Sequence, residues 1–229
     1  MHTLVLFDID GTLLDSTGAG VRAIDLAGKS LHGQSFDALS TNYAGRLDPV
    51  IIDDLLISHS ITPTPAARQD FRRAYHNALQ RELEHNPAVH ACPGVHALVD
   101  RVQQDPDLTT GLLTGNFPET GALKLAAGKI DIDAFQIRVW GDDSQTDPPS
   151  RNDLPNVAKQ RFNSPNGQLR TVVIGDTPAD IACAHACGCK VIAVATGPID
   201  HQTLKDHHPD HLYRTLEDTQ AVLDNIKSN

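Results

Sequence analysis

Residues 4–12, Leu-Val-Leu-Phe-Asp-Ile-Asp-Gly-Thr, constrain the fold more than any other stretch of the chain. Residues 3–7 are a short apolar, β-prone run, which is typical of a strand buried on both faces. Asp8 ends this run, and Asp10 and Gly11 follow it. Ligands bind beyond the carboxyl ends of strands in an open α/β sheet, so we expect both carboxylates at such a site. The structural alternative is a simple Asp-Gly hairpin turn.

Further apolar runs at residues 109–113, 137–140, 171–174 and 190–195 predict four more strands. Between them lie segments with helical spacing, at about residues 95–102, 118–128, 152–162 and 178–188, and a last amphipathic helix closes the chain. Strands that alternate with helices predict an α/β fold with a parallel, doubly wound sheet.

Residues 16–87 differ from the rest because they contain helical patterns and no buried strand. Asp48-Pro49 is typical of a helix start, with Asp48 as N-cap and Pro49 at the first helical position. Phe71, Tyr75, Leu79 and Leu83 recur every four residues and predict a longer helix. We therefore predict an all-helical domain at 16–87, inserted into an α/β core made of residues 1–15 and 88–229.

The 229 residues carry a formal net charge of -10, which argues against a nucleic-acid or anionic-membrane surface. No apolar run approaches the ~20 residues that cross a bilayer. A secretory leader is not apparent after Met1, so we expect a cytoplasmic protein. The four cysteines form no C-x-x-C pair and are interpreted as small buried thiols, and His207, His208 and His211 as a solvated polar stretch.

Each predicted strand with a polar end places its polar groups on the same edge of the sheet. The second strand ends in Thr114-Gly115-Asn116 and the fourth in Gly175-Asp176, with Asp180 four residues later. Asp8, Asp10 and Asp176 offer the hard oxygen ligands that suit Mg²⁺. Thr114 and the amides after it stand at a helix start, which favours anions. The pattern predicts a site for a metal ion and a phosphate group.

A phosphate also needs a cation from the protein. Arg151, at the mouth of the acidic loop 141–149, is our candidate, and Lys159 is the alternative, although two helical turns separate it from the strand ends. In the helical insertion, Arg46 precedes a helix and is either a ligand for a substrate carboxylate or second phosphate, or a solvated side chain.

Together these residues resemble the four motifs of the haloacid dehalogenase superfamily. The motifs correspond in order to Asp8-Ile9-Asp10-Gly11-Thr12, to Thr114, to the basic residue Arg151, and to Gly175-Asp176-Thr177-Pro178-Ala179-Asp180. The helical insertion resembles the small α-helical cap of phosphoglycolate phosphatase-like members. Superfamily members usually carry a lysine at the third motif, where this chain has an arginine that is not equivalent to an ammonium.

The resemblance implies a Rossmann-like core and a Mg²⁺-dependent phosphatase acting on a small phosphorylated metabolite. It implies Asp8 as nucleophile, Asp10 as general acid–base, and a metal ion held by Asp8, the Asp10 carbonyl and Asp176, with Asp180 behind them. Phosphate would be bound by Gly11, Thr114, Gly115, Asn116 and Arg151.

Other activities remain open at this point. A phosphomutase would share the nucleophile and the acid–base, and a non-catalytic binding protein would keep the fold. A carboxylate at Asp10 argues against carbon–halogen cleavage, which needs no leaving-group protonation. The sequence is compatible with a monomer or a homodimer.

Overall fold

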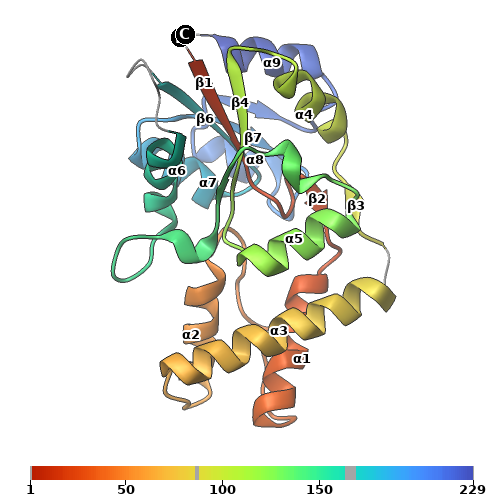
Figure 1. Cartoon of the computed structure of the whole chain (residues 1–229), viewed down its shortest axis with the longest axis vertical. Coiled ribbons are helices and arrows are strands. Elements are labelled where there is room, and N and C mark those ends of the chain that lie inside the picture. The colour runs from red at the N-terminus through yellow and green to blue at the C-terminus, as the bar shows by residue number, and fades with distance from the viewer. Residues whose placement is uncertain (1, 86–87, 163–168, 229) are drawn as a thin grey trace.

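The computed structural model of the chain describes residues 2–85, 88–162 and 169–228. A six-stranded sheet forms its centre, in the order β5-β4-β1-β6-β7-β8, with every neighbouring pair parallel (Figure 1). The strands are β1 (His2–Phe7), β4 (Leu108–Leu113), β5 (Ile137–Val139), β6 (Leu169–Gly175), β7 (Lys190–Val194) and β8 (His211–Tyr213). The predicted α/β fold with a doubly wound parallel sheet is confirmed.

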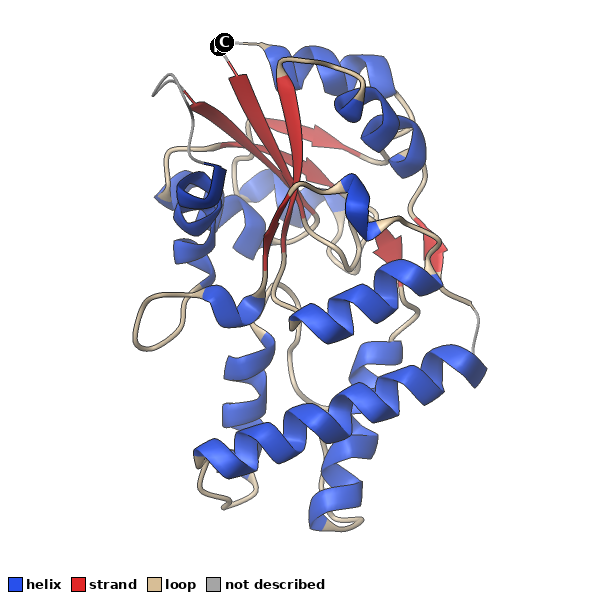
Figure 2. Cartoon of the chain, in the orientation of Figure 1, coloured by secondary structure: helices blue, strands red, loops and turns tan. Residues whose placement is uncertain are grey.

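Alternation along β1 divides the core into two layers. Val5 and Phe7 pack with the helices α4 (Val95–Gln103), α5 (Pro118–Ala127) and α9 (Thr219–Lys227). Leu4 and Leu6 pack with α6 (Leu154–Phe162), α7 (Pro178–Ala186) and α8 (His201–Asp206). Because successive side chains of a strand point to opposite faces, one short apolar run supplies both layers. Figure 2 shows the helices on the two sides of the sheet.

The predicted helical insertion consists of α1 (Ala19–His32), α2 (Asp48–Ser58) and α3 (Pro65–His85) and has its own apolar core. Residues 16–85 contain no strand. The short antiparallel strands β2 (Leu14–Asp15) and β3 (His90–Ala91) pair where the chain leaves and re-enters the sheet domain. The predicted end of the insertion at Pro87 lies outside the described residues. In Figure 1 the three helices, which we call the cap, lie at the carboxyl ends of the strands.

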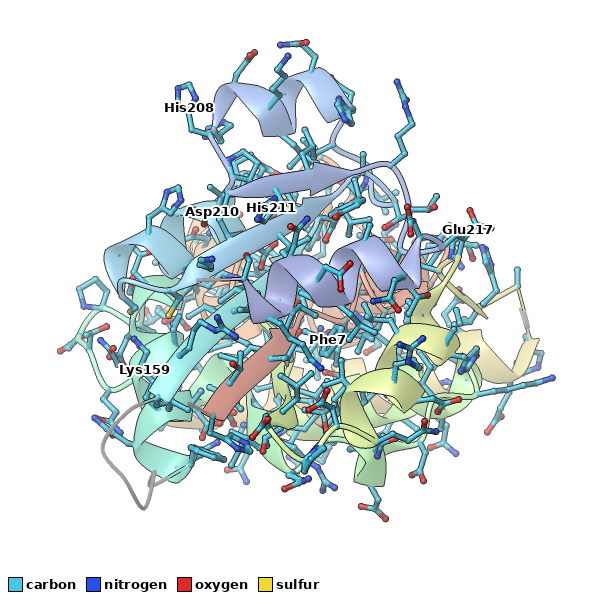
Figure 3. All side chains as sticks on the ribbon, turned by 90° about the horizontal axis from the view of Figure 1, so that it is seen from above. Phe7, Lys159, His208, Asp210, His211 and Glu217 are labelled. Atoms are coloured by element: carbon cyan, nitrogen blue, oxygen red, sulfur yellow. The ribbon has the colours of Figure 1, made fainter. Side chains whose placement is uncertain are left out.

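Two details of the sequence analysis are wrong. Asp48 is the first residue of α2 and does not cap it, since Leu47 occupies the N-cap position without a side-chain bond. The second is a missed strand, because His211 begins the edge strand β8 and pairs with Ile192 of β7, where the sequence predicted no strand. Figure 3 shows His208 and His211 beside α8 and β8, far from Lys159 on α6.

Three of the four free cysteines, Cys92, Cys183 and Cys189, are buried, as expected, and Cys187 is half-buried. Within the described ranges, no helix combines the length and the apolar character that crossing a bilayer requires.

Candidate active site

The acidic turn after β1 is fixed by its backbone. Asp8 continues the sheet by donating its amide to the Ile174 carbonyl at 3.0 Å, and its side chain is buried. Gly11 has a φ of +74°, and a Cβ there would collide with the Asp176 carboxylate and the Gly197 backbone. A glycine is therefore required at this position both for the left-handed turn and for the close approach of Asp176.

Three buried carboxylates gather at the ends of β1 and β6. One oxygen from each of Asp8, Asp176 and Asp180 lies within 4.8 Å of the other two. Thr12 Oγ1 donates to Asp176 Oδ1 at 3.1 Å. Burial raises the pKa of Asp8 to about 6, opposed by the Arg151 charge, and burial with the charges of Asp180 and Asp8 raises the pKa of Asp176 well above its usual value. Three buried carboxylates so close together need a positive charge nearby if they are to ionise.

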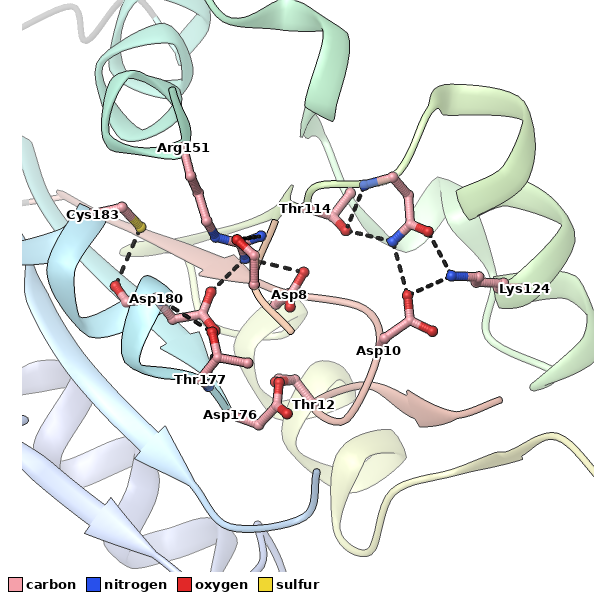
Figure 4. A network of polar contacts seen from close by, with 12 residues as sticks. Asp8, Asp10, Thr12, Thr114, Lys124, Arg151, Asp176, Thr177, Asp180 and Cys183 are labelled. Carbon is pink, nitrogen blue, oxygen red and sulfur yellow. Dashed lines mark hydrogen bonds and ion pairs between the residues drawn. The ribbon is translucent and has the colours of Figure 1, made fainter. Parts of the chain in front are cut away.

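Arg151 supplies part of that charge. Its Nη2 lies 2.5 Å from Asp180 Oδ1 and 3.3 Å from Asp8 Oδ1, and the side chain is 7% exposed. Burial disfavours the charged guanidinium, but the Asp180 and Asp8 carboxylates outweigh it and raise the pKa of Arg151. Of the two predicted cations, this is the one in the site (Figure 4). Lys159 instead donates to the Cys187 carbonyl at 2.6 Å.

The Asp180 side chain is held by hydrogen bonds at the N-terminus of its own helix, α7. Its Oδ2 accepts from the Thr177 amide at 3.0 Å and the Thr177 hydroxyl at 2.6 Å, in the capping box that begins α7. Both of its oxygens thus have protein partners. Asp180 belongs to the acidic cluster by distance, and its bonds orient Arg151.

The turn after β4 brings Thr114, Gly115 and Asn116 to the same place. Thr114 Oγ1 accepts from Asn116 Nδ2 at 2.8 Å. A Cβ on Gly115 would collide with the Arg46 carbonyl, and the Gly115 carbonyl accepts from the Asp48 amide at 2.7 Å. The cap and the sheet domain therefore meet at Gly115 without an intervening side chain.

Asp48 spans this boundary. Its Oδ2 accepts from the Phe117 amide at 3.0 Å and from the Thr120 hydroxyl at 3.3 Å. Asp48 therefore joins the helical insertion to the start of α5 in the sheet domain, and does not, as the sequence predicted, cap its own helix α2. Burial raises the pKa of Asp48 to about 6, and the Lys124 charge opposes this.

Lys124 is a site residue that the sequence analysis missed. Its Nζ donates to Asp10 Oδ2 and to Asn116 Oδ1, each at 2.6 Å, although its side chain is only 6% exposed. Burial opposes ionisation of Asp10, but the Lys124 ammonium and the bonds from Lys124, Asn116 and Ser16 outweigh it and lower the pKa of Asp10. The signal in the sequence was a lysine on the buried face of α5, in line with Phe117 and Thr120.

These residues surround a cavity of about 580 Å³ between the cap and the sheet domain. Of the predicted site residues it is lined by Asp8, Asp10, Gly11, Arg46, Thr114, Gly115, Asn116, Arg151 and Asp176. Asp180 lies behind Arg151 and does not line it. Arg46 lines the cavity, but its guanidinium bonds Asp54 and the Asn42 carbonyl. The structure thus brings the predicted motifs together around one cavity. The Arg46 guanidinium, in contrast, is paired with residues of the cap.

Comparison with known proteins places these observations in a family. Residues 5–194 match the haloacid dehalogenase-like hydrolase family. The chain is 25% identical to phosphoglycolate phosphatase of Escherichia coli, over 96% of this chain and 91% of that protein. It is 23% identical to pyrophosphatase PpaX of Bacillus pumilus, over 96% of this chain and 95% of that protein.

Solved structures show the same fold. A hydrolase from Pseudomonas syringae superposes with a TM-score of 0.75 at 23% identity, with 100% of both chains covered. A predicted phosphoglycolate phosphatase from Haemophilus somnus gives a TM-score of 0.69 at 19% identity, with 97% and 98% covered. At these identities the likeness concerns the architecture of sheet and cap.

Proposed function

Because this chain belongs to the haloacid dehalogenase-like hydrolase family, we propose that it hydrolyses a small phosphate monoester through an aspartyl-phosphate on Asp8. The observation that carries the proposal is the meeting of Asp8, Asp10, Arg151 and Asp176 in one cavity. A carboxylate nucleophile, an acid–base, a cation and a buried acidic pair are the groups that this reaction requires. The phosphatases among the curated relatives support the same reaction class.

The acidic cluster fits a divalent cation. Its oxygens are hard ligands, and three buried carboxylates lie beside a single guanidinium, so one positive charge opposes three acidic groups. We assign the Asp8 side chain, the Asp10 carbonyl and Asp176 as the groups that would hold Mg²⁺. When bound, Mg²⁺ supplies charge that stabilises the phosphoryl oxygens.

The protein groups divide the reaction between them. Asp10 enters this reaction protonated, although in the free protein burial is outweighed by the Lys124 charge, which lowers its pKa. A carboxylate oxygen of Asp8 attacks phosphorus, the Asp8–phosphoryl bond forms, and the bond to the leaving oxygen breaks as Asp10 gives that oxygen its proton. Water then attacks phosphorus, Asp10 takes a proton from the water, and the Asp8–phosphoryl bond breaks to release phosphate. A positioned acid–base of this kind contributes about 10²–10⁴ in rate.

Thr114, Gly115, Asn116 and Arg151 would bind the transferring phosphoryl group. Arg151 lines the cavity beside Asp8 with a guanidinium whose pKa is raised, despite burial, by the Asp180 and Asp8 carboxylates, so it presents a positive charge toward the site. Donors fixed in this way stabilise charge that develops during the reaction, which is usually the largest single catalytic contribution.

The test is a screen of phosphorylated metabolites, with Mg²⁺ and with a chelator, ranked by kcat/KM. We expect Mg²⁺-dependent phosphate release that Asp8→Asn abolishes. Asp224→Asn, an exposed residue of α9, is the matched control and should retain the wild-type rate. Turnover by Asp8→Asn at the wild-type rate would rule out the covalent route. Transfer to a second sugar hydroxyl instead of water would identify a mutase.

A further inference from the structure

The buried ammonium of Lys124 has two polar partners, and both belong to the candidate active site. It bonds Asp10 Oδ2 and Asn116 Oδ1, while Asn116 Nδ2 donates to the same Asp10 oxygen at 2.9 Å. Ser16 Oγ donates to the other Asp10 oxygen at 3.0 Å. Asp10, Asn116 and Lys124 thus form a closed triangle of hydrogen bonds. Figure 4 labels Asp10 and Lys124 and marks the bond between them.

A triangle of this kind fixes orientation. Asn116 is itself anchored by its bond to Thr114 Oγ1, so the amide cannot turn without losing a bond. A buried charge is retained only where it is paired and hydrogen-bonded, because desolvation is otherwise too costly. Lys124, Asn116 and Ser16 together hold both oxygens of the Asp10 carboxyl, which remains 38% exposed and lines the cavity.

The cap contacts the same ammonium. A Cβ added at Gly20 in the first turn of α1 would lie 3.2 Å from Lys124 Nζ and 3.5 Å from the Tyr75 hydroxyl of α3. The α1 backbone therefore passes close to the ammonium and covers it. Lys124 is packed between the acid–base of the sheet domain and the cap.

We propose that Lys124 is a positioning residue that, together with Asn116, holds Asp10 at the leaving oxygen of the substrate. This inference rests on the proposed function, since it gives Asp10 the role of acid–base. A misplaced acid affects substrates unequally: an alkyl phosphate needs a proton on its departing oxygen, whereas p-nitrophenyl phosphate releases a stable anion and does not. The loss on removing Lys124 should therefore depend on the leaving group.

The experiment compares kcat/KM for an alkyl phosphate with kcat/KM for p-nitrophenyl phosphate, in wild type, Lys124→Met and Lys124→Gln, with Mg²⁺ present. This parameter reports the steps up to the aspartyl-phosphate, in which the leaving oxygen departs, and not the hydrolysis of that intermediate, which is the same for both esters. Methionine has similar length and no donor, whereas glutamine keeps an N–H donor. We expect the ratio of the two rates to fall about 10- to 100-fold in Lys124→Met, because small misplacements of catalytic groups cost up to about 10² in rate. Lys124→Gln should recover part of the ratio.

Lys159→Met is the matched control, because Lys159 donates to the Cys187 carbonyl and does not line the cavity, and its ratio should equal that of wild type. An unchanged ratio in Lys124→Met, or an equal fall with both esters, would overturn the proposal. If Lys124→Met does not fold, Lys124→Gln decides: a ratio below wild type supports the proposal, and a wild-type ratio refutes it. Failure of wild type with both esters would contradict the proposed function itself, and with it the role of Lys124.

Discussion

Arg151 Nη2 lies 3.3 Å from Asp8 Oδ1, and both side chains are buried. The same nitrogen bonds Asp180 Oδ1 at 2.5 Å, so Asp180 fixes the guanidinium that faces Asp8. The third-motif cation is thus part of a buried chain of charges that runs from the start of α7 to the end of β1. We expect these buried ion pairs to affect both the free energy of unfolding and the rate of the proposed reaction, which can be measured separately.

Replacing Arg151 by Met should destabilise the metal-free protein by about 3–5 kcal/mol, since it leaves buried carboxylates without their cation. Urea unfolding measures this difference. Arg138→Met is the control, because Arg138 pairs with the exposed Asp133 and should change stability by less than about 1 kcal/mol. A cost for Arg151→Met as small as for Arg138→Met would contradict the description of Arg151 as a paired buried charge.

Adding Mg²⁺ should raise the free energy of unfolding of the wild type, because a ligand that binds only the folded state stabilises it by mass action. The gain is about 2.7 kcal/mol at a hundredfold excess over Kd. Asp176→Asn should lose most of this gain, whereas Asp224→Asn should keep it. Thermal unfolding with and without Mg²⁺ measures both, and an undiminished gain in Asp176→Asn would remove Asp176 from the metal site.

The pH dependence of stability should report on Asp48. Its pKa is raised to about 6 in the folded protein, so between about pH 4 and pH 6 the folded state binds more protons than the unfolded state. The contribution of Asp48 is therefore present at low pH and is lost as the pH rises through 6. Relative to wild type, Asp48→Asn should gain about 1–3 kcal/mol between pH 4 and pH 7.

Urea unfolding of both proteins across this range gives the difference directly, because contributions from Asp8 and Asp176 are common to both. A difference that does not change with pH would show that Asp48 titrates normally.

Gly115→Ala should reduce activity by moving the cap, since the new methyl group meets the Arg46 carbonyl. We expect a loss of up to about 10² in kcat/KM, the scale of a 1 Å misplacement. Gly33→Ala is the control, because its Cβ meets no atom within 4 Å, although its φ of +95° makes alanine strained. The control should lose some stability and keep its kcat/KM. Equal kcat/KM in both variants would argue that the contact at Gly115 does not determine the position of the cap.

Much of this fold is determined by local sequence. A short apolar run between polar residues specifies a strand, and its two alternating faces specify two helical layers, so β1, β4, β5, β6 and β7 follow from the pattern. The edge strand β8 and the short helix α8 were not predicted. The acids at the ends of β1 and β6 also follow, because parallel strands bring their carboxyl ends to one edge. Gly11 follows from the turn that it permits.

The tertiary structure decided the partners of the charged side chains. The sequence offered Arg151 and Lys159 as cations, and only the packing of α6 against β4 and α7 shows which of them meets Asp8. Lys124 and Asp48 each carry local signals of a helix residue, yet each bonds a segment 69 or more residues away in sequence. Hydrogen bonds and desolvation act over a few ångströms in space, whereas sequence patterns describe neighbours along the chain. Most strands and helices could therefore be predicted from the sequence, whereas the hydrogen bonds and ion pairs between their charged side chains could be identified only from the tertiary structure.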